Sequence, residues 1–422
     1  MPRIYLLALF APLILFARAE AGTMTLQECL KKAASANHEL RVSAYDEKIA
    51  EGNVGIARSG YLPHLNFQGG YTAQQAPQAM VVQGNTLETQ QSDYGFFSVT
   101  AEQILYDFGR TSARYRRAEA LRDATAFSHT AREKDVFLRV VTAYYGILES
   151  RKLMQAAEEE ITQMSDHLRI AKNLYEQGVV TRNDLLQAEV QLANSKQRGL
   201  MQANRLENGW LYLNYLTGQA ASYRADLEEA VPSDASPVPV AEEFPLTNRA
   251  EVMALRKGIE ADNLAIKESR SFYFPEIFTR LGVEYVQNKK VEEQAILYAT
   301  VGLKINLFDG LATTSRYRQA VQSRMQNEEQ LRMVESQIHL EYETACNDAR
   351  IAAERIRTAE KAVLQGEENL RINKDRYQEH VGTATDVIDA QTLLTKTQTE
   401  FYRAVFDHQV AIARIKKAKG EL

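Results

Sequence analysis

The chain has 422 residues, of which 55 are acidic and 50 are basic, giving a formal net charge of −5. This nearly balanced, mildly acidic charge argues against nucleic acid as a partner. Ala, Glu, Gln, Arg and Leu dominate and mean hydropathy is negative, which is typical of long helices exposed to water.

Residues 1–21 have the layout of a secretory signal peptide. Arg3 is followed by an apolar run, Ile4–Ala17, and small residues stand at Ala19 and Ala21. The run is shorter than the roughly 20 residues that a membrane-spanning helix needs. We therefore expect export from the cytoplasm, with cleavage after Ala19 or Ala21.

The rest of the chain is an internal repeat. Leu105–Ala118 and Leu307–Ala320 are separated by 202 residues and are identical at seven of fourteen positions. The same offset relates Tyr175–Leu192 to Tyr377–Leu394. Such self-similarity predicts that the fold is built twice from one unit.

The repeat divides the chain into a first half at 22–218 and a second half at 246–422. Between them, residues 219–245 hold four prolines and several acidic residues, so we expect an irregular connector. Each half is predicted to contain, in order, a helix, two strands, a long helix and a further helix.

The predicted strands alternate sharply between apolar and polar residues. Residues 297–307 hold six apolar positions in strict alternation, and 276–287 repeat the pattern. Residues 94–106 and roughly 65–82 are the first-half counterparts. The length, polar second face and flanking aromatics fit membrane-spanning barrel strands, although two hairpins on a water-facing core would alternate in the same way.

The predicted long helices carry a coiled-coil pattern. Apolar or small residues recur from 154 to 175 at alternating spacings of three and four, and again from 356 to 377. The helix expected between Gly109 and Gln177 contains no proline, and at 1.5 Å per residue it extends about 100 Å. No ordinary globular core is that long.

Four strands cannot close a barrel, and open strand edges are not tolerated in lipid. Closure therefore requires several chains. Two chains give eight strands and an interior filled by side chains, whereas three give twelve and leave a lumen. The physical argument favours a trimer with a hollow interior.

The chain resembles the TolC family of outer-membrane efflux and secretion channels over nearly its whole length. The resemblance rests on TLQECLKKAASANHELR, YLPHLNF, LYDFGR, NYLTG, YFPEIFT and INLFDG, together with YEQGVVTRNDLLQAE and YQEHVGTATDVIDAQ. It implies a mainly helical fold with transmembrane β-structure. In a homotrimer, a twelve-stranded outer-membrane barrel continues as a twelve-helix periplasmic barrel. It further implies a periplasmic adaptor, an inner-membrane transporter and outer-membrane lipid as partners.

Two segments that interrupt the helical pattern, 178–184 and 380–386, are expected to be hairpin turns. The resemblance implies that these tips dock the adaptor and that the tunnel narrows beside them. Thr181 and Asp184 have capping-box spacing, as have Thr383 and Asp386, so helix capping alone could explain both acids. The docking positions carried over from the family are Gly178, Val179, Val180, Val381, Gly382 and Thr383.

Asp389 is different, because its first-half counterpart is Gln187 and capping does not require it. In a trimer, Asp386 and Asp389 would place six carboxylates around the opening, matching the acidic constriction of the family and attracting cations. A solvated surface acid is the alternative. Ala384 replaces an arginine that ties the closed state in some relatives, so closed-state contacts would fall instead to Arg182, Tyr175 or Tyr377.

Catalytic chemistry has no support in the sequence. The seven histidines are scattered, no metal-binding or nucleophile motif occurs, and we predict neither an enzyme nor a bound cofactor or metal. Cys29 and Cys346 lie in helical patterns and are expected to be buried free thiols, although a disulfide is possible in the periplasm.

The predicted function is the exit duct of a tripartite efflux pump for small molecules, in the outer membrane of a Gram-negative bacterium and extending into the periplasm. Two alternatives remain open at this point. One is the exit duct of a type I protein secretion system, and the other is a periplasmic coiled-coil scaffold or adaptor without membrane strands.

Overall fold

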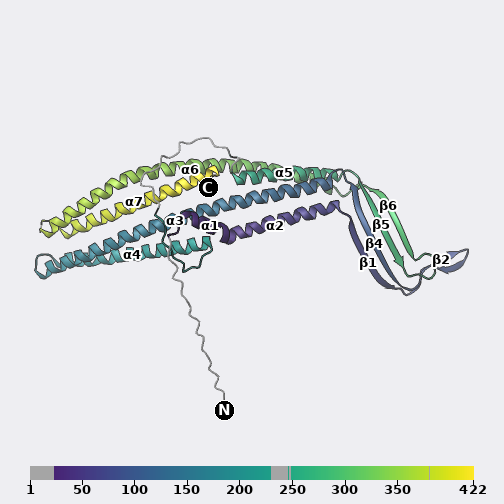
Figure 1. Ribbon diagram of the computed structural model, residues 1–422, viewed down its shortest axis with the longest axis horizontal. Helices are drawn as coiled ribbons and strands as arrows, with labels where there is room; N and C mark the ends of the chain where they lie inside the picture. The colour runs from purple at the N-terminus through teal and green to yellow at the C-terminus, as the bar shows by residue number, and fades with distance from the viewer. Residues whose placement is uncertain (1–22, 230–245, 247–248, 380) are drawn as a thin grey trace, which may run out of the picture. The chain divides into compact units, whose positions relative to one another are not determined.

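The computed structural model describes residues 23–229, 246, 249–379 and 381–422 (Figure 1). The predicted signal peptide, the prolines of the connector and His380 lie outside this range. The described chain forms two compact units that cut across the sequence repeats, because each repeat contributes to both. Unit 1 contains the described residues up to Ser35, then 140–229 and 358–406; unit 2 contains the remainder.

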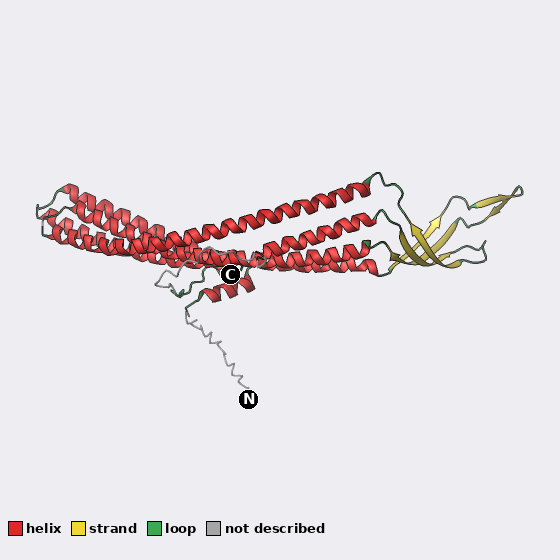
Figure 2. Cartoon of the chain, turned by 90° about the horizontal axis from the view of Figure 1, so that it is seen from above, coloured by secondary structure: helices red, strands yellow, loops and turns green. Residues whose placement is uncertain are grey.

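The second half follows the predicted order, whereas the first half begins with two helices and contains two additional short strands. The first half holds α1 (Leu26–Ala36), α2 (His38–Arg58), β1 (His64–Ala73), β2 (Ala79–Val82), β3 (Asn85–Glu88), β4 (Asp93–Tyr106), α3 (Arg110–Glu176) and α4 (Arg182–Thr217). The second holds α5 (Ala250–Ser271), β5 (Glu276–Val286), β6 (Ala295–Lys304), α6 (Ala312–Gln378) and α7 (Ala384–Lys419). Figure 2 shows how helices dominate the chain.

The helix lengths confirm the repeat. The long helices α3 and α6 each have 67 residues, and the helices that follow them, α4 and α7, each have 36. At 1.5 Å per residue, α3 and α6 are each about 100 Å long, as the absence of proline predicted. Among the described helices, none has an apolar stretch long enough to cross a membrane.

One strand prediction was wrong. Residues 65–82 were expected to form one strand, but β1 ends at Ala73, and Ala79–Val82 pairs instead with Asn85–Glu88 in a separate two-stranded hairpin. The turn between these short strands uses Gln83 and Gly84, both at positive φ. A period-2 pattern does not reveal where a strand stops when the next segment has the same composition.

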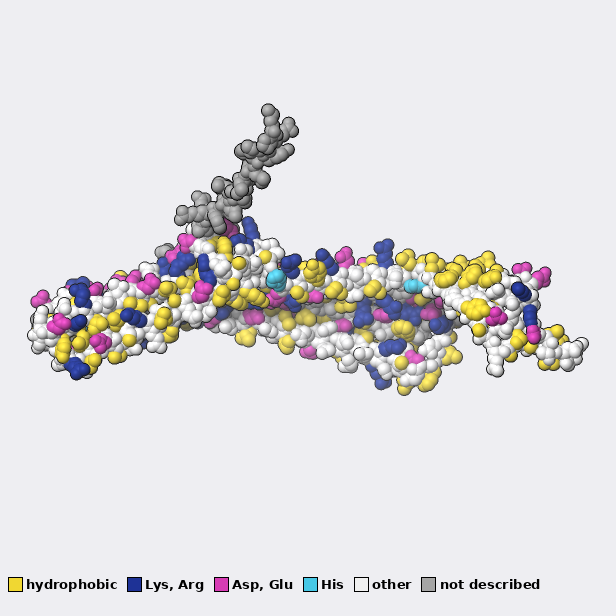
Figure 3. All heavy atoms as spheres, turned by 90° about the horizontal axis from the view of Figure 1, so that it is seen from below, with side chains coloured by type: hydrophobic (Ala, Val, Ile, Leu, Met, Phe, Trp, Pro, Cys, Tyr) yellow, Lys and Arg dark blue, Asp and Glu magenta, His cyan; other side chains and the backbone are white. Residues whose placement is uncertain are grey.

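The main sheet of unit 2 is antiparallel, with the order β1-β4-β5-β6. Its register aligns apolar side chains in rows across all four strands, one of which is formed by Phe67, Val99, Val283 and Leu297. Phe67 and Leu297 are 74% and 79% exposed within the single chain. On the face shown in Figure 3, apolar side chains gather over the strands, and many Lys and Arg side chains gather on the helices next to them.

The other face of the sheet carries charged side chains. Arg280 and Glu102 are direct partners in the register and form an ion pair across β5 and β4, at 3.2 Å. Glu284 shares this face, because it alternates with Val283 along β5. One apolar and one polar face are expected of a sheet that separates lipid from a water-filled lumen.

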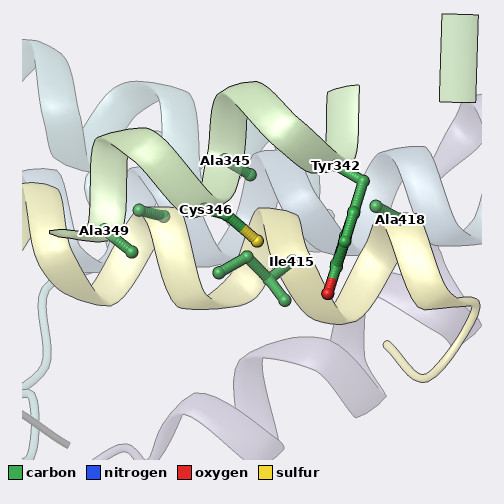
Figure 4. Packing of buried hydrophobic residues seen from close by; sticks show 7 residues of the cluster. Tyr342, Ala345, Cys346, Ala349, Ile415 and Ala418 are labelled. Carbon is green, nitrogen blue, oxygen red and sulfur yellow. The ribbon is translucent and has the colours of Figure 1, made fainter. Parts of the chain in front are cut away.

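The helices are held together mainly by small residues. In unit 2, Ala345 and Ala349 of α6 pack against Ala411 and Ala418 of α7, with Cys346 among them (Figure 4). Small side chains let two helices approach closely along their length. Cys29 and Cys346 are both buried and free, as predicted. Burial raises the pKa of both thiols, to about 11 for Cys29, so neither is a reactive thiolate at neutral pH.

Candidate functional site at the helical tips

The first hairpin turn joins α3 to α4 in unit 1. The backbone reverses at Gly178, which has a φ of 75°, and the Val179 amide donates to the Leu174 carbonyl at 2.9 Å. Positive φ is costly for most residues with a Cβ atom, so glycine is favoured here. Val179 is 51% exposed at the end of the turn, and Val180 is half-buried.

Helix α4 begins with a complete capping box, as predicted. The Thr181 hydroxyl accepts from the Asp184 amide at 3.3 Å, and the Asp184 carboxylate accepts from the Thr181 amide at 2.9 Å. Both contacts satisfy amide groups that the first turn of a helix would leave unpaired. Asp184 therefore has a structural role that accounts for its position.

The second turn, between α6 and α7, is capped in the same way but reverses differently. The Thr383 amide donates to the Asp386 carboxylate at 2.9 Å, and the Asp386 amide donates to the Thr383 hydroxyl at 3.2 Å. Hydrogen bonding to the Asp386 carboxylate by the Thr383 amide first, and by the Thr383 side chain second, lowers the pKa of Asp386. Gly382 has no positive φ, and an added Cβ would lie 3.1 Å from the Cβ of Arg376. At this glycine the space for a side chain is limited, whereas the backbone conformation is one that other residues also adopt.

The residues predicted to form the constriction lie in different environments. Asp389 is exposed and forms no ion pair with any described residue, and the same is true of Arg182. Tyr175 is 39% exposed. Tyr377, in contrast, is only 5% exposed and its ring lies 5.3 Å from that of His167 of α3.

Tyr377 belongs to the core of unit 1. It is buried with Leu370, Ala384, Val387 and Leu394, and burial raises the pKa of its hydroxyl. The negative charge of Asp184 adds to this rise, and a role for Tyr377 in the constriction stays a prediction. Within the described chain its hydroxyl has no hydrogen-bond partner, and neither has the Nε2 atom of His167.

A groove between α4 and α7 was missed by the sequence analysis. Its volume is about 400 Å³ and it lies just beyond the two turns. Leu186 and Val190, which are 46% and 61% exposed, provide its apolar wall on α4, and Ile388 faces them from α7. The remaining lining side chains are polar: Asn183, Gln187, Gln191 and Thr385.

Polar contacts join the two walls of the groove. Thr385 of α7 donates to Gln187 of α4, and Gln191 of α4 donates to Thr392 of α7, each at 3.5 Å. The sequence contained one sign of this surface, because Leu186 and Val190 are apolar residues one helical turn apart. The opposite wall could not be assigned without the tertiary structure.

Comparison with known proteins places the chain in a family. The model of the family described as outer membrane efflux protein matches residues 29–219 and 245–421, which is most of the chain and both repeats. The chain belongs to the outer membrane efflux protein family. Members of this TolC-like family reside in the outer membrane of Gram-negative bacteria and extend into the periplasm, and this location applies here.

Individual relatives are distant but match over nearly their full length. The outer membrane protein TolC of Vibrio cholerae is 22% identical, over 97% of this chain and 95% of the relative. The proteases secretion protein PrtF of Dickeya chrysanthemi is also 22% identical, over 84% and 79%. The crystal structure of the outer membrane protein VceC from Vibrio cholerae superimposes with a TM-score of 0.81 at 17% identity, covering 94% of this chain and 96% of VceC.

These comparisons confirm the predicted fold class and the resemblance to TolC. They match outer-membrane channels rather than periplasmic adaptors, so the scaffold alternative receives no support. Within the described residues no group of His, Cys, Asp and Glu side chains is arranged to hold a metal ion.

Proposed function

We propose that the protein is the exit duct of a tripartite efflux pump, assembled from three copies of the chain. The trimer is supported by the sheet of unit 2, in which β1 and β6 each pair on one side only. Both edges would leave backbone groups unsatisfied in lipid, and pairing β6 of one copy with β1 of the next removes every edge. Three copies give twelve strands and a lumen.

The groove between α4 and α7 is the observation that supports adaptor docking. It combines an apolar strip of Leu186, Val190 and Ile388 with amide and hydroxyl groups along its rim. An amphipathic helix binds such a groove through apolar residues spaced one turn apart. We therefore propose that a helical hairpin of a periplasmic adaptor binds here, beside Val179 and Val381 at the turns.

The test is a double substitution in the groove, Leu186→Asp with Val190→Asp. Two carboxylates on the apolar strip should abolish docking, because an adaptor helix would bury them without partners. The expected result is normal trimer yield in detergent, loss of adaptor co-purification and loss of export. Leu200→Asp on the same helix outside the groove is the matched control. Adaptor co-purification that survives in the double variant would contradict the docking site.

Protein secretion is the second candidate, and one observation favours it. PrtF, named as a proteases secretion protein, is as similar in sequence as the TolC relative. The transporter that co-purifies with the tagged channel decides between the two functions. An ABC transporter encoded with a secreted substrate would favour secretion, whereas a multidrug transporter would favour efflux.

A further inference from the structure

The apolar face of the main sheet continues past the strands as an aromatic cluster. Tyr106, the last residue of β4, pairs with Ile277, whose side chain lies on the apolar face. The ring of Phe108 lies 4.9 Å from that of Tyr106, edge to face, and is stacked on Phe274 at 5.0 Å. Aromatic residues at the end of a lipid-facing surface mark the interface between membrane and water.

A groove of about 420 Å³ begins at this aromatic cluster and lies between α3 and α5, within unit 2. Phe108 and Phe274 form its end next to the sheet. Three cationic side chains also line it: Arg116 of α3, and Lys267 and Arg270 of α5. No Asp or Glu is among the lining residues.

These three cations differ from the other basic residues nearby. Arg114 and Arg117, on another side of α3, both form ion pairs with Glu268, and Arg110 pairs with Glu276. Glu276 alternates with Ile277, so this paired set lies toward the polar face of the sheet. Arg116, Lys267 and Arg270 are exposed and form no ion pair with a carboxylate anywhere in the described ranges. The positive charges of these three side chains therefore lie, without a carboxylate partner, on the side of the apolar face.

The internal repeat shows that this arrangement is not confined to one groove. Arg270 corresponds to Arg58 at the 212-residue offset of the strand entries, and Arg116 corresponds to Arg318 at the 202-residue offset. Arg58 and Arg318 are also exposed. Each of the four helices that enter or leave the main sheet thus carries an exposed arginine at an equivalent level.

We infer that the groove binds the headgroup of an anionic phospholipid in the periplasmic leaflet of the outer membrane. The phosphate would lie among Arg116, Lys267 and Arg270, with the acyl chains against Phe108, Phe274 and the apolar sheet face. Long basic side chains commonly reach from apolar surface to headgroup phosphates, and basic pockets at this depth bind anionic lipids. A zwitterionic headgroup fits less well, because the groove offers no carboxylate to its ammonium group.

Native mass spectrometry of the purified full-length channel can test this inference. The channel is mixed with detergent micelles that contain phosphatidylglycerol, or phosphatidylcholine with the same acyl chains. We expect phosphatidylglycerol to be retained roughly tenfold more strongly. Neutralising the groove with Arg116→Gln, Lys267→Gln and Arg270→Gln should remove that preference, and Arg270→Gln alone should reduce it about threefold.

The matched control removes three exposed charges from α6 away from the groove, with Arg332→Gln, Arg350→Gln and Arg357→Gln. It should retain phosphatidylglycerol like the wild type. Equal retention by the groove variants and the wild type would overturn the inference. So would equal loss in the control, or displacement of the lipid by inorganic phosphate at the same concentration, which would indicate a general anion site. The inference rests on the outer-membrane location and not on the exported cargo, so an intact export assay separates its failure from that of the proposed duct.

Discussion

Both hairpins of unit 1 reverse the chain direction between two helices, but they differ in the side-chain contacts between those helices. The first, α3 with α4, contains a buried ionic contact, in which Glu160 is 1% exposed and accepts from Ser195 at 3.0 Å and from Arg198. The corresponding positions of the second hairpin are Ala362, Thr397 and Glu400, which cannot form it. The second hairpin has an apolar core that includes Leu370 and Leu394.

This comparison separates what a hairpin needs from what a channel needs. Both turns keep the Thr-Asp capping box and a glycine, because both must reverse a helix and satisfy its first amide groups. The hairpins differ in the buried contact and in Asp389 against Gln187. The features that both hairpins share are explained by the needs of folding. The features that differ are the candidates for separate roles of the two hairpins.

The largest expected effect comes from the buried contact. Arg198→Met removes the cationic partner of the Glu160 carboxylate and leaves only the Ser195 hydroxyl of the two donors, so the charge in this buried site is no longer compensated, which costs about 3 kcal/mol. Hydrogen exchange should show faster opening of α4 near Ser195, with α7 unaffected. Glu400→Met, at the equivalent position of the second hairpin, is the control. Equal protection of the amides from hydrogen exchange in the Arg198→Met and Glu400→Met variants would show that the contact does not stabilise the first hairpin.

Gly178→Ala tests the different geometry of the turns. The φ of 75° is unfavourable for alanine, so the first hairpin should lose about 1 kcal/mol of local stability. Gly146→Ala in the interior of α3, where an added Cβ meets nothing within 4 Å, should instead gain about 0.5 kcal/mol. The two changes in amide exchange should have opposite signs.

The shared caps predict a symmetrical result. Thr181→Ala and Thr383→Ala each remove an N-cap acceptor, and each should cost about 1 kcal/mol in its own hairpin. Exchange of the first-turn amides of α4 and α7 measures the loss. A clear inequality between the hairpins would mean that one cap has a further role.

The second cap should also respond to pH. The pKa of Asp386 is lowered in the folded chain from its ordinary value of 3.8, so its contribution is complete above that value. The contribution is lost as the pH falls through the lower folded value. First-turn exchange in α7, corrected for its intrinsic pH dependence, should therefore be unchanged from pH 7 to 5 and should rise only below pH 4.

The smallest effect on stability, and the largest on conduction, is expected at Asp389. Because its side chain is exposed, Asp389→Ala should change stability by less than about 0.5 kcal/mol. If the proposed acidic ring exists in the trimer, this change should weaken the preference for cations in planar bilayers. Asp389→Glu keeps the charge and should keep the selectivity. Unchanged reversal potentials in the Asp389→Ala variant would contradict the proposed acidic ring.

The sequence by itself determined the repeated elements. Alternation of period two identified the four strands of the main sheet, and the alternating three-and-four spacing identified seam residues such as Met164 and Ala171, which are 1% and 0% exposed. The Thr-x-x-Asp spacing identified both caps. These features depend on residues within one or two turns or along one strand, so they can be inferred without knowing the fold.

Only the tertiary structure decided which surfaces those elements form. The row of Phe67, Val99, Val283 and Leu297 depends on register between strands as much as 230 residues apart. The tip groove required α7 to lie beside α4, and the burial of Tyr377 in the core of unit 1 likewise depends on residues distant in sequence. The end of β1 at Ala73 could not be predicted from the sequence either. Such features depend on contacts between residues that are distant in sequence. Local periodicity carries no information about those contacts.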